Sequence, residues 1–165
     1  LTSVTQKNPV TVRNADIDHL KDQEFHVNAF RYREQDMLAS AAKRIKRLID
    51  AGMDSFDAFN VCQHHLIEAA EAYIERIVLE QFYSFIVNIQ DTGCKKIMLS
   101  LCQLFALHTF EIHKDWYLEA EYMAPVKTKA IRKLVNQLCW EIRQDAVPLV
   151  DAFDIPPNCL GEIGK

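Results

Sequence analysis

Apolar side chains recur every three or four residues across four separate stretches of this sequence, and charged side chains fill the gaps between them. This periodicity predicts amphipathic helices, because residues three and four apart share one helix face. The first stretch runs from about Asp22 to Asp50, and Gly52 is suited to end it. Its apolar positions are Phe30, Met37, Leu38, Ala41, Ile45, Leu48 and Ile49.

The second and third stretches are longer than an average helix. The second begins near Asp54, whose side chain can accept a hydrogen bond from a free amide of the first turn. Its apolar band continues to Asn88 or beyond, which predicts one helix of more than thirty residues. The Asp-Thr-Gly triplet at residues 91–93 then breaks the pattern, and a third helix is predicted over residues 94–116.

Two prolines mark the expected start and end of the helix in the fourth stretch. Pro125 suits the first turn of a helix, and the apolar positions behind it continue through Ile142 to Val150. Pro148 is expected to kink or end this helix, because proline lacks an amide hydrogen and clashes with the preceding turn.

Four long amphipathic helices with short connections predict an all-α fold, namely an up-and-down four-helix bundle of long helices. Residues 1–21 alternate only weakly, and Pro9 disfavours helical geometry at Asn8, so they predict an extended N-terminal arm or linker. The helical domain then covers residues 22–155, and residues 156–165 form a C-terminal tail. No β-strand is expected in residues 26–48, 60–86, 96–114 or 128–145.

The composition is that of one folded domain. Its 165 residues are 49% hydrophobic and 25% charged, which excludes an intrinsically disordered chain. With a net charge of −4, the chain lacks the basic excess of a nucleic-acid-binding protein. It contains no run of 18 apolar residues, so no membrane span is predicted. Residues 1–20 lack the apolar core of a signal peptide, and a chain that begins with Leu1 is expected to be a piece of something longer. One basic cluster predicts a solvated helix face: Lys43, Arg44, Lys46 and Arg47.

The sequence has an odd number of cysteines and no Cys-x-x-Cys pair. A disulfide framework usually has an even number, and a zinc site usually has such pairs, so neither is expected. Most of them lie among apolar residues, or three or four positions from one on the same helix face. This placement favours buried, reduced thiols. They are Cys62, Cys94, Cys102, Cys139 and Cys159.

Few residues are candidates for a catalytic or metal site. Neither the Glu-x-x-His motif of di-iron bundles nor a glycine-rich phosphate loop occurs. His65 and Glu68 share a helix face and predict a surface hydrogen bond. Cys62 can face His65 but lies on the apolar band, and His108 lies on an apolar stripe that predicts a core position. The residues therefore nominate no catalytic, cofactor-binding or metal-binding side chain.

The sequence holds more aromatic side chains than four apolar stripes need. Six of them either face a partner surface or cap the ends of the bundle, and both interpretations stay open. They are Phe82, Tyr83, Phe85, Trp116, Tyr117 and Tyr122. Three glutamates at helical spacing, Glu68, Glu71 and Glu75, predict a solvated or subunit-facing side of the second helix.

Four collinear segments carry a family likeness. They are Phe25-His26-x-x-Ala29-Phe30-Arg31-Tyr32-Arg33, Ala58-Phe59-Asn60-x-Cys62-Gln63-x-His65-Leu66, Leu101-Cys102-x-Leu104-Phe105-Ala106-Leu107 and Leu149-Val150-Asp151-Ala152-Phe153. In this order and at these separations they resemble the C-terminal helical domain of the peroxisomal acyl-CoA oxidase family. The likeness runs from about Asn8 to Pro156.

This resemblance implies an FAD-dependent oxidase that converts acyl-CoA and O2 to trans-2-enoyl-CoA and H2O2, the first step of peroxisomal fatty acid β-oxidation. In the family the catalytic base and the flavin pocket lie upstream of the matched segment. The chain alone is therefore expected to be inactive and to hold no FAD.

The resemblance also implies how the domain is used. It packs against the upstream catalytic part, helps to form a homodimer, and resides in the peroxisome with a fatty acyl-CoA substrate. The chain ends Gly164-Lys165 instead of with a Ser-Lys-Leu type tripeptide, so this localisation comes from the family alone. The alternative is a stand-alone helical protein-interaction module without enzymatic activity.

Overall fold

The computed structural model describes residues 9–156 and 159, and over these residues it contains helices and no strand. The all-α prediction is therefore confirmed. The elements are α1 (Pro9–Arg13), α2 (Ile17–Leu20), α3 (Gln23–Asp50), α4 (Ser55–Val61), α5 (Gln63–Val87), α6 (Thr92–Ile112), α7 (Lys114–Glu119), α8 (Pro125–Ile142), a 3-10 turn (Arg143–Asp145) and α9 (Ala146–Asp151).

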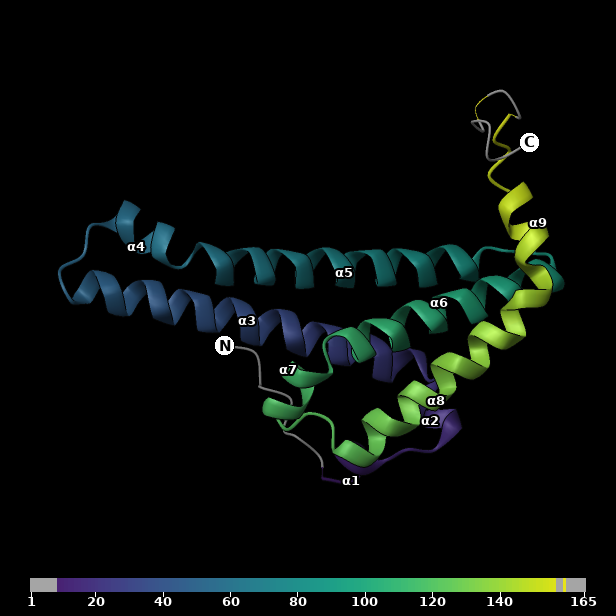
Figure 1. Ribbon diagram of the computed structural model, residues 1–165, viewed down its shortest axis with the longest axis horizontal. Helices are drawn as coiled ribbons and strands as arrows, with labels where there is room; N and C mark the ends of the chain where they lie inside the picture. The colour runs from purple at the N-terminus through teal and green to yellow at the C-terminus, as the bar shows by residue number, and fades with distance from the viewer. Residues whose placement is uncertain (1–8, 157–158, 160–165) are drawn as a thin grey trace.

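Two antiparallel helix pairs organise the molecule (Figure 1). The helices α3 and α5 form a long hairpin, α6 packs along α8, and α5 joins the pairs through its contact with α6. At its α4 end the hairpin extends beyond α6 and α8 (Figure 1). The four long helices therefore do not stay together as a bundle over their whole lengths.

Three aspartates cap helices at or near the predicted starts, although α6 begins at Thr92, inside the triplet that was expected to break the pattern. The Asp22 carboxylate accepts a hydrogen bond from the Phe25 amide at 2.9 Å. Asp54 accepts one from the Phe56 amide, and Asp91 accepts one from the Cys94 amide. Each carboxylate satisfies an amide that has no partner inside its helix.

Glycine and proline also act as predicted at two other ends. Gly52 follows α3 with a φ of 93°, a left-handed conformation that glycine adopts without steric cost. Pro125 stands in the first turn of α8, where its missing amide hydrogen is not needed.

Two of the predicted long helices are divided. The second breaks at Cys62 into α4 and α5, and the third breaks at His113 into α6 and α7. At each break the backbone leaves helical geometry for one residue, with ψ values of 3° and 24°. The second break turns α7 so that Tyr117 enters the core, where it is fully buried. Tertiary packing overrides the local periodicity there.

The prediction for the N-terminal segment is wrong where the structure describes it. Residues 9–13 and 17–20 form short helices, although an extended arm was expected. This segment is tied to the start of α8 by a hydrogen bond from the Ala124 amide to the Val12 carbonyl. Pro148 also differs from the prediction, because α8 ends earlier, at Ile142, and Pro148 lies in the first turn of α9.

The core centres on Phe110 of α6. Its ring lies 5.2–5.8 Å, between centroids, from four other rings of the core. These rings belong to Phe25, His26, Phe30 and Tyr117. They join α3, α6 and α7 at one end of the hairpin, so this cluster holds the two helix pairs together.

The sequence left open where six aromatic side chains lie, and the structure separates them into two groups. Tyr83 and Tyr117 are buried, and Phe82, Trp116 and Tyr122 pack against the core. Phe85 is 59% exposed and faces outward. Five of the six therefore complete the core, and Phe85 lies on the surface.

The free half of the α3–α5 hairpin has small side chains inside. Its buried apolar residues are Ala41, Ala58, Cys62, Ala69 and Ala72. Larger apolar side chains on the same elements are exposed, among them Leu38, Phe56, Phe59 and Ile67. Small side chains let α3 and α5 approach closely, and they leave the large ones on the surface.

Candidate functional site

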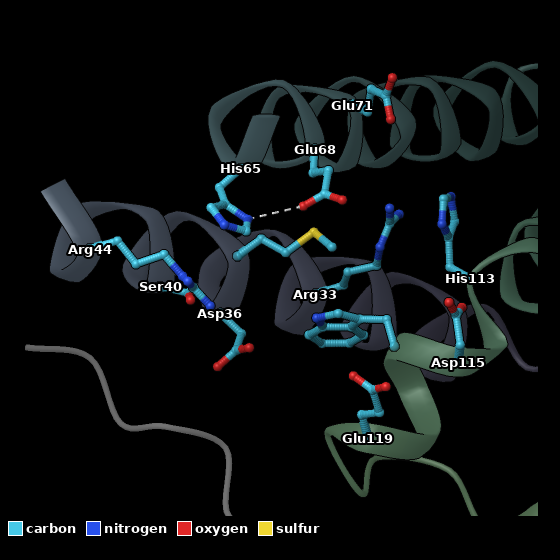
Figure 2. A pocket seen from close by; sticks show the side chains of 12 residues that line it. Arg33, Asp36, Ser40, Arg44, His65, Glu68, Glu71, His113, Asp115 and Glu119 are labelled. Atoms are coloured by element: carbon cyan, nitrogen blue, oxygen red, sulfur yellow. Dashed lines mark ion pairs between the residues drawn. The ribbon is translucent and has the colours of Figure 1, made fainter. Parts of the chain in front are cut away.

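A cleft of about 480 Å³ lies between α3, α5 and α7, and we call it the polar cleft (Figure 2). Its lining is mostly charged or polar. The lining residues are Arg33, Asp36, Met37, Ser40, Arg44, His65, Glu68, Glu71, His113, Asp115, Trp116 and Glu119.

A buried charge network lies beneath this cleft. The Arg33 side chain is 3% exposed and forms an ion pair with Glu75, and the other oxygen of Glu75 lies 3.1 Å from His113 Nε2. Burial raises the pKa of Glu75, but the hydrogen bond from His113 and the charge of Arg33 outweigh it, so the pKa lies below its usual value. Glu75 is therefore a carboxylate at neutral pH. Within the described residues the Arg33 Nε has no hydrogen-bond partner.

The three glutamates of α5 have different environments. Glu68 pairs with His64 Nε2 at 3.1 Å and with His65 Nδ1 at 3.4 Å, so the predicted His65–Glu68 surface pair is confirmed (Figure 2). Glu71 is exposed, as predicted. Glu75 departs from the prediction of a solvated side, because Arg33 and His113 enclose it.

The polar cleft carries an acidic excess. Five of its side chains are carboxylic acids, whereas two, Arg33 and Arg44, are arginines. Across the described residues, no group of three or more His, Cys, Asp or Glu side chains is placed to hold a metal ion. The charges that line the polar cleft can orient a charged partner. The lining residues include no activated nucleophile placed beside a base.

Two histidine and cysteine predictions require correction. His108 is exposed and does not lie in the core. Cys62 and Cys102 are buried as expected, but Cys94, Cys139 and Cys159 are exposed. Cys139 follows the buried Leu138 but lies on the exposed side of α8, Cys94 lies in the first turn of α6, and Cys159 lies in the C-terminal segment. The basic cluster at Lys43, Arg44, Lys46 and Arg47 is solvated, as predicted.

A second buried network surrounds His26, which is fully buried. The ring nitrogen Nε2 donates to the Leu20 carbonyl at 2.6 Å, and Nδ1 accepts from the Tyr83 hydroxyl at 2.7 Å. This pairing requires the neutral ring, and burial lowers the pKa of His26 to about 4. Burial also raises the pKa of the neighbouring Cys102 to about 12, so this cysteine is an unreactive thiol.

Acid is expected to unfold the chain through His26. The pKa of this residue is lower in the folded state than its unfolded value of 6.5, so its stabilising effect is complete above pH 6.5 and is lost as the pH falls towards 4. The loss amounts to about 3 kcal/mol. Urea denaturation at several pH values would show a weaker pH dependence for His26→Gln than for the natural chain. The exposed His108→Gln is the control, and an unchanged pH dependence in His26→Gln would contradict this assignment.

Lys127 of α8 is a fully buried residue that the sequence analysis did not identify. Its Nζ donates to the Thr11 carbonyl at 2.9 Å, lies 3.0 Å from His19 Nε2, and sits 3.7 Å from the centre of the Phe25 ring. Burial lowers the pKa of Lys127 to about 8. The lysine therefore ties α1 and α2 to α8, and a lysine in an amphipathic helix gives no sequence signal of this role.

Comparison with known proteins identifies relatives. The acyl-CoA oxidase family model matches residues 22–161. The peroxisomal acyl-coenzyme A oxidase 2 of Arabidopsis thaliana is 37% identical over 157 residues, which are 95% of this chain and 22% of that protein. Human peroxisomal acyl-coenzyme A oxidase 1 is 28% identical over 135 residues, which are 82% of this chain and 20% of that protein.

Solved structures share the fold. An apo form of Caenorhabditis elegans acyl-CoA oxidase-1 matches 94% of this chain and 24% of its own, with a TM-score of 0.84 and 19% identity. Arabidopsis thaliana acyl-CoA oxidase 1 matches 89% of this chain and 22% of its own, with a TM-score of 0.80 and 24% identity. No helix in the described part of the chain is long and apolar enough to cross a membrane.

Proposed function

This chain belongs to the acyl-CoA oxidase family, and we propose that it is the C-terminal helical domain of an FAD-dependent acyl-CoA oxidase. The whole enzyme oxidises fatty acyl-CoA to trans-2-enoyl-CoA and reduces O2 to H2O2 in peroxisomal β-oxidation. Residues 1–165 supply packing and a subunit interface, and the upstream part supplies the catalytic base.

The length ratio is the observation that carries this proposal. The chain spans 22% of the Arabidopsis relative and 20% of the human one, so most of each relative lies outside the match. Its side chains agree with a non-catalytic role. The buried Cys102 is an unreactive thiol, and the charged groups beneath the polar cleft neutralise one another.

The flavin is assigned to the upstream part for an electrostatic reason. One solved Caenorhabditis elegans relative is complexed with FAD and ATP, and FAD carries an anionic pyrophosphate. The polar cleft has an acidic excess that would repel such a group. Its residues do not fit the cofactor, so we derive no step of the reaction through this chain.

Exposed apolar side chains support the packing role. The C-terminal apolar face is formed by Trp140, Val147, Val150, Phe153 and Ile155, each more than half exposed. Several large exposed apolar side chains within one short stretch of chain are typical of a surface that a partner covers. We assign this face to the upstream part of the same enzyme, and peroxisomal residence follows from the same proposal.

Reconstitution from two pieces tests the function. The upstream part expressed alone is expected to aggregate or lose FAD, and co-expression with residues 1–165 is expected to restore peroxide production from a fatty acyl-CoA. Trp140→Asp should weaken this rescue, while the exposed polar control Asn136→Asp should leave it intact. A truncated oxidase that stays soluble, retains FAD and turns over normally would overturn the proposal. The absence of an oxidase reading frame upstream of Leu1 would instead favour the stand-alone interaction module.

A further inference from the structure

Few contacts hold the N-terminal segment, residues 11–20, against the rest of the chain. The helix α1 contacts α8, and α2 contacts α3. Of residues 11–20, whose burial the structure describes, Leu20 alone is buried. The hydrogen bonds that residues 11–19 make with distant parts of the described chain all reach the start of α8, at Ala124 and Lys127. The attachment of this segment therefore depends on a small number of polar groups.

Two of these bonds meet at Lys127 Nζ, which donates to the Thr11 carbonyl at 2.9 Å and lies 3.0 Å from His19 Nε2. The Phe25 ring completes the arrangement, because its centre lies 3.7 Å from Lys127 Nζ and 4.6 Å from the centre of the His19 ring. We call these four groups, from Thr11, His19, Phe25 and Lys127, the lysine clasp. An ammonium group can only donate, so His19 Nε2 is the acceptor and the ring carries its proton on Nδ1.

We propose that protonation of His19 opens the lysine clasp and releases residues 11–19 from α8, while the buried Leu20 stays in place. A protonated imidazole carries a hydrogen on both ring nitrogens, so it has no acceptor left for Lys127. It also sets a second positive charge 3.0 Å from an ammonium group on a fully buried residue. The closed clasp is therefore compatible with the neutral His19 ring alone. The inference concerns contacts inside this chain and does not depend on the proposed function.

The charged groups around His19 determine where the clasp opens on the pH scale. Burial and the charge of Lys127 lower the pKa of His19, and they outweigh Asp22, before α3, and Asp16, before α2, which raise it. The His26 ring of α3, with its pKa of about 4, stays neutral as His19 titrates. Because the folded-state pKa of His19 lies below the unfolded value of 6.5, the clasp is complete above pH 6.5 and is lost as the pH falls through the folded-state pKa.

Mild alkali is expected to leave the clasp closed. The pKa of Lys127 is about 8, so the ammonium group loses its charge above that pH. A neutral amine keeps two N–H groups, which still donate to the Thr11 carbonyl and to the His19 ring. The clasp therefore responds to acid through His19.

Amide hydrogen exchange followed by NMR in the whole 165-residue chain tests this inference. The reporter is the Ala124 amide, which donates to the Val12 carbonyl across the junction between the N-terminal segment and α8. Between about pH 7 and about pH 5, its protection, corrected for the intrinsic exchange rate, is expected to fall at least about tenfold. The Phe110 amide in the buried part of α6 is the internal control, and its protection should stay within about twofold over the same interval.

Three variants separate the two partners of the clasp. His19→Gln keeps an acceptor oxygen for Lys127 but takes up no proton, so the Ala124 amide should stay protected at about pH 5. Lys127→Met keeps an apolar stem without the charge, so the pKa of His19, followed by NMR of its ring, should rise towards 6.5. His108→Gln removes an exposed histidine elsewhere and should retain the acid response. If Lys127→Met fails to fold, His19→Gln still decides the question, because the His19 side chain is only partly buried.

Each of three outcomes would overturn the inference. The Ala124 amide could keep its protection after His19 has titrated, His19→Gln could lose protection in acid like the natural chain, or the Ala124 and Phe110 amides could lose protection together. The last outcome would mean that acid unfolds the whole domain through His26 without first opening the clasp. Two-piece reconstitution of peroxide production depends on none of these results, so the proposed function and the acid-sensitive clasp stand or fall separately.

Discussion

Replacement of Glu75 by alanine is expected to lower the free energy of unfolding by about 3 kcal/mol. The substitution leaves Arg33 buried without the carboxylate that balances its charge, and it removes the hydrogen bond of His113. An unpaired cation in this environment is costly, because little water reaches it. Urea denaturation monitored by circular dichroism at pH 7 measures the change.

The matched control is Glu71→Ala, one turn earlier on α5. Glu71 is exposed, so its removal is expected to change the unfolding free energy by less than about 0.5 kcal/mol. Acid should reduce the difference between Glu75→Ala and the natural chain. The folded-state pKa of Glu75 is depressed, so its contribution is present above the unfolded pKa and disappears as the pH falls through the folded one. Equal effects of the two substitutions at pH 7 would refute the role of the network.

Substitution of Phe110 by alanine is expected to cost about 3–5 kcal/mol of stability. The Phe110 ring is buried and packs against four other rings of the core. Its removal leaves a cavity at the junction of the two helix pairs, and the surrounding rings can fill that cavity only in part. Thermal and urea denaturation should both report the loss.

Phe56→Ala serves as the comparison for Phe110→Ala. Both substitutions remove the same atoms, but the Phe56 side chain is exposed on α4. The expected cost at Phe56 is within about 0.5 kcal/mol. If both substitutions destabilised the chain to the same extent, the core would not be centred where the aromatic cluster lies.

The helix boundaries that the sequence predicted best are those fixed by local chemistry. Asp22, Asp54 and Asp91 cap helices within three residues of themselves, and Gly52 permits a left-handed turn at its own position. These effects depend on the nearest neighbours alone, so they are readable without a fold. The breaks at Cys62 and His113 have no such local signal, because they serve contacts made elsewhere in the molecule.

The charged interior was the part hidden from sequence reasoning. Arg33 and Lys127 are residue types that usually lie on the surface, and both are buried here. Their hydrogen-bond partners are 42 residues away in sequence for Arg33 and 108 or more for Lys127. Helical periodicity identifies which residues share a face, but it does not tell which distant face will cover a cation. The opposite error occurred for His108, whose apolar neighbours suggested burial.

The close approach of α3 and α5 through small side chains reverses the usual pattern of tolerance to mutation. In most cores, shortening a side chain is the damaging change. At Ala41, Ala58, Ala69 and Ala72 there is almost nothing to shorten, and these positions are buried. Any longer side chain there would push the helices apart along the free half of the hairpin. Genetic variation in this region is therefore constrained by an upper limit on residue size, while the large exposed residues outside it are constrained only by the partners that they meet.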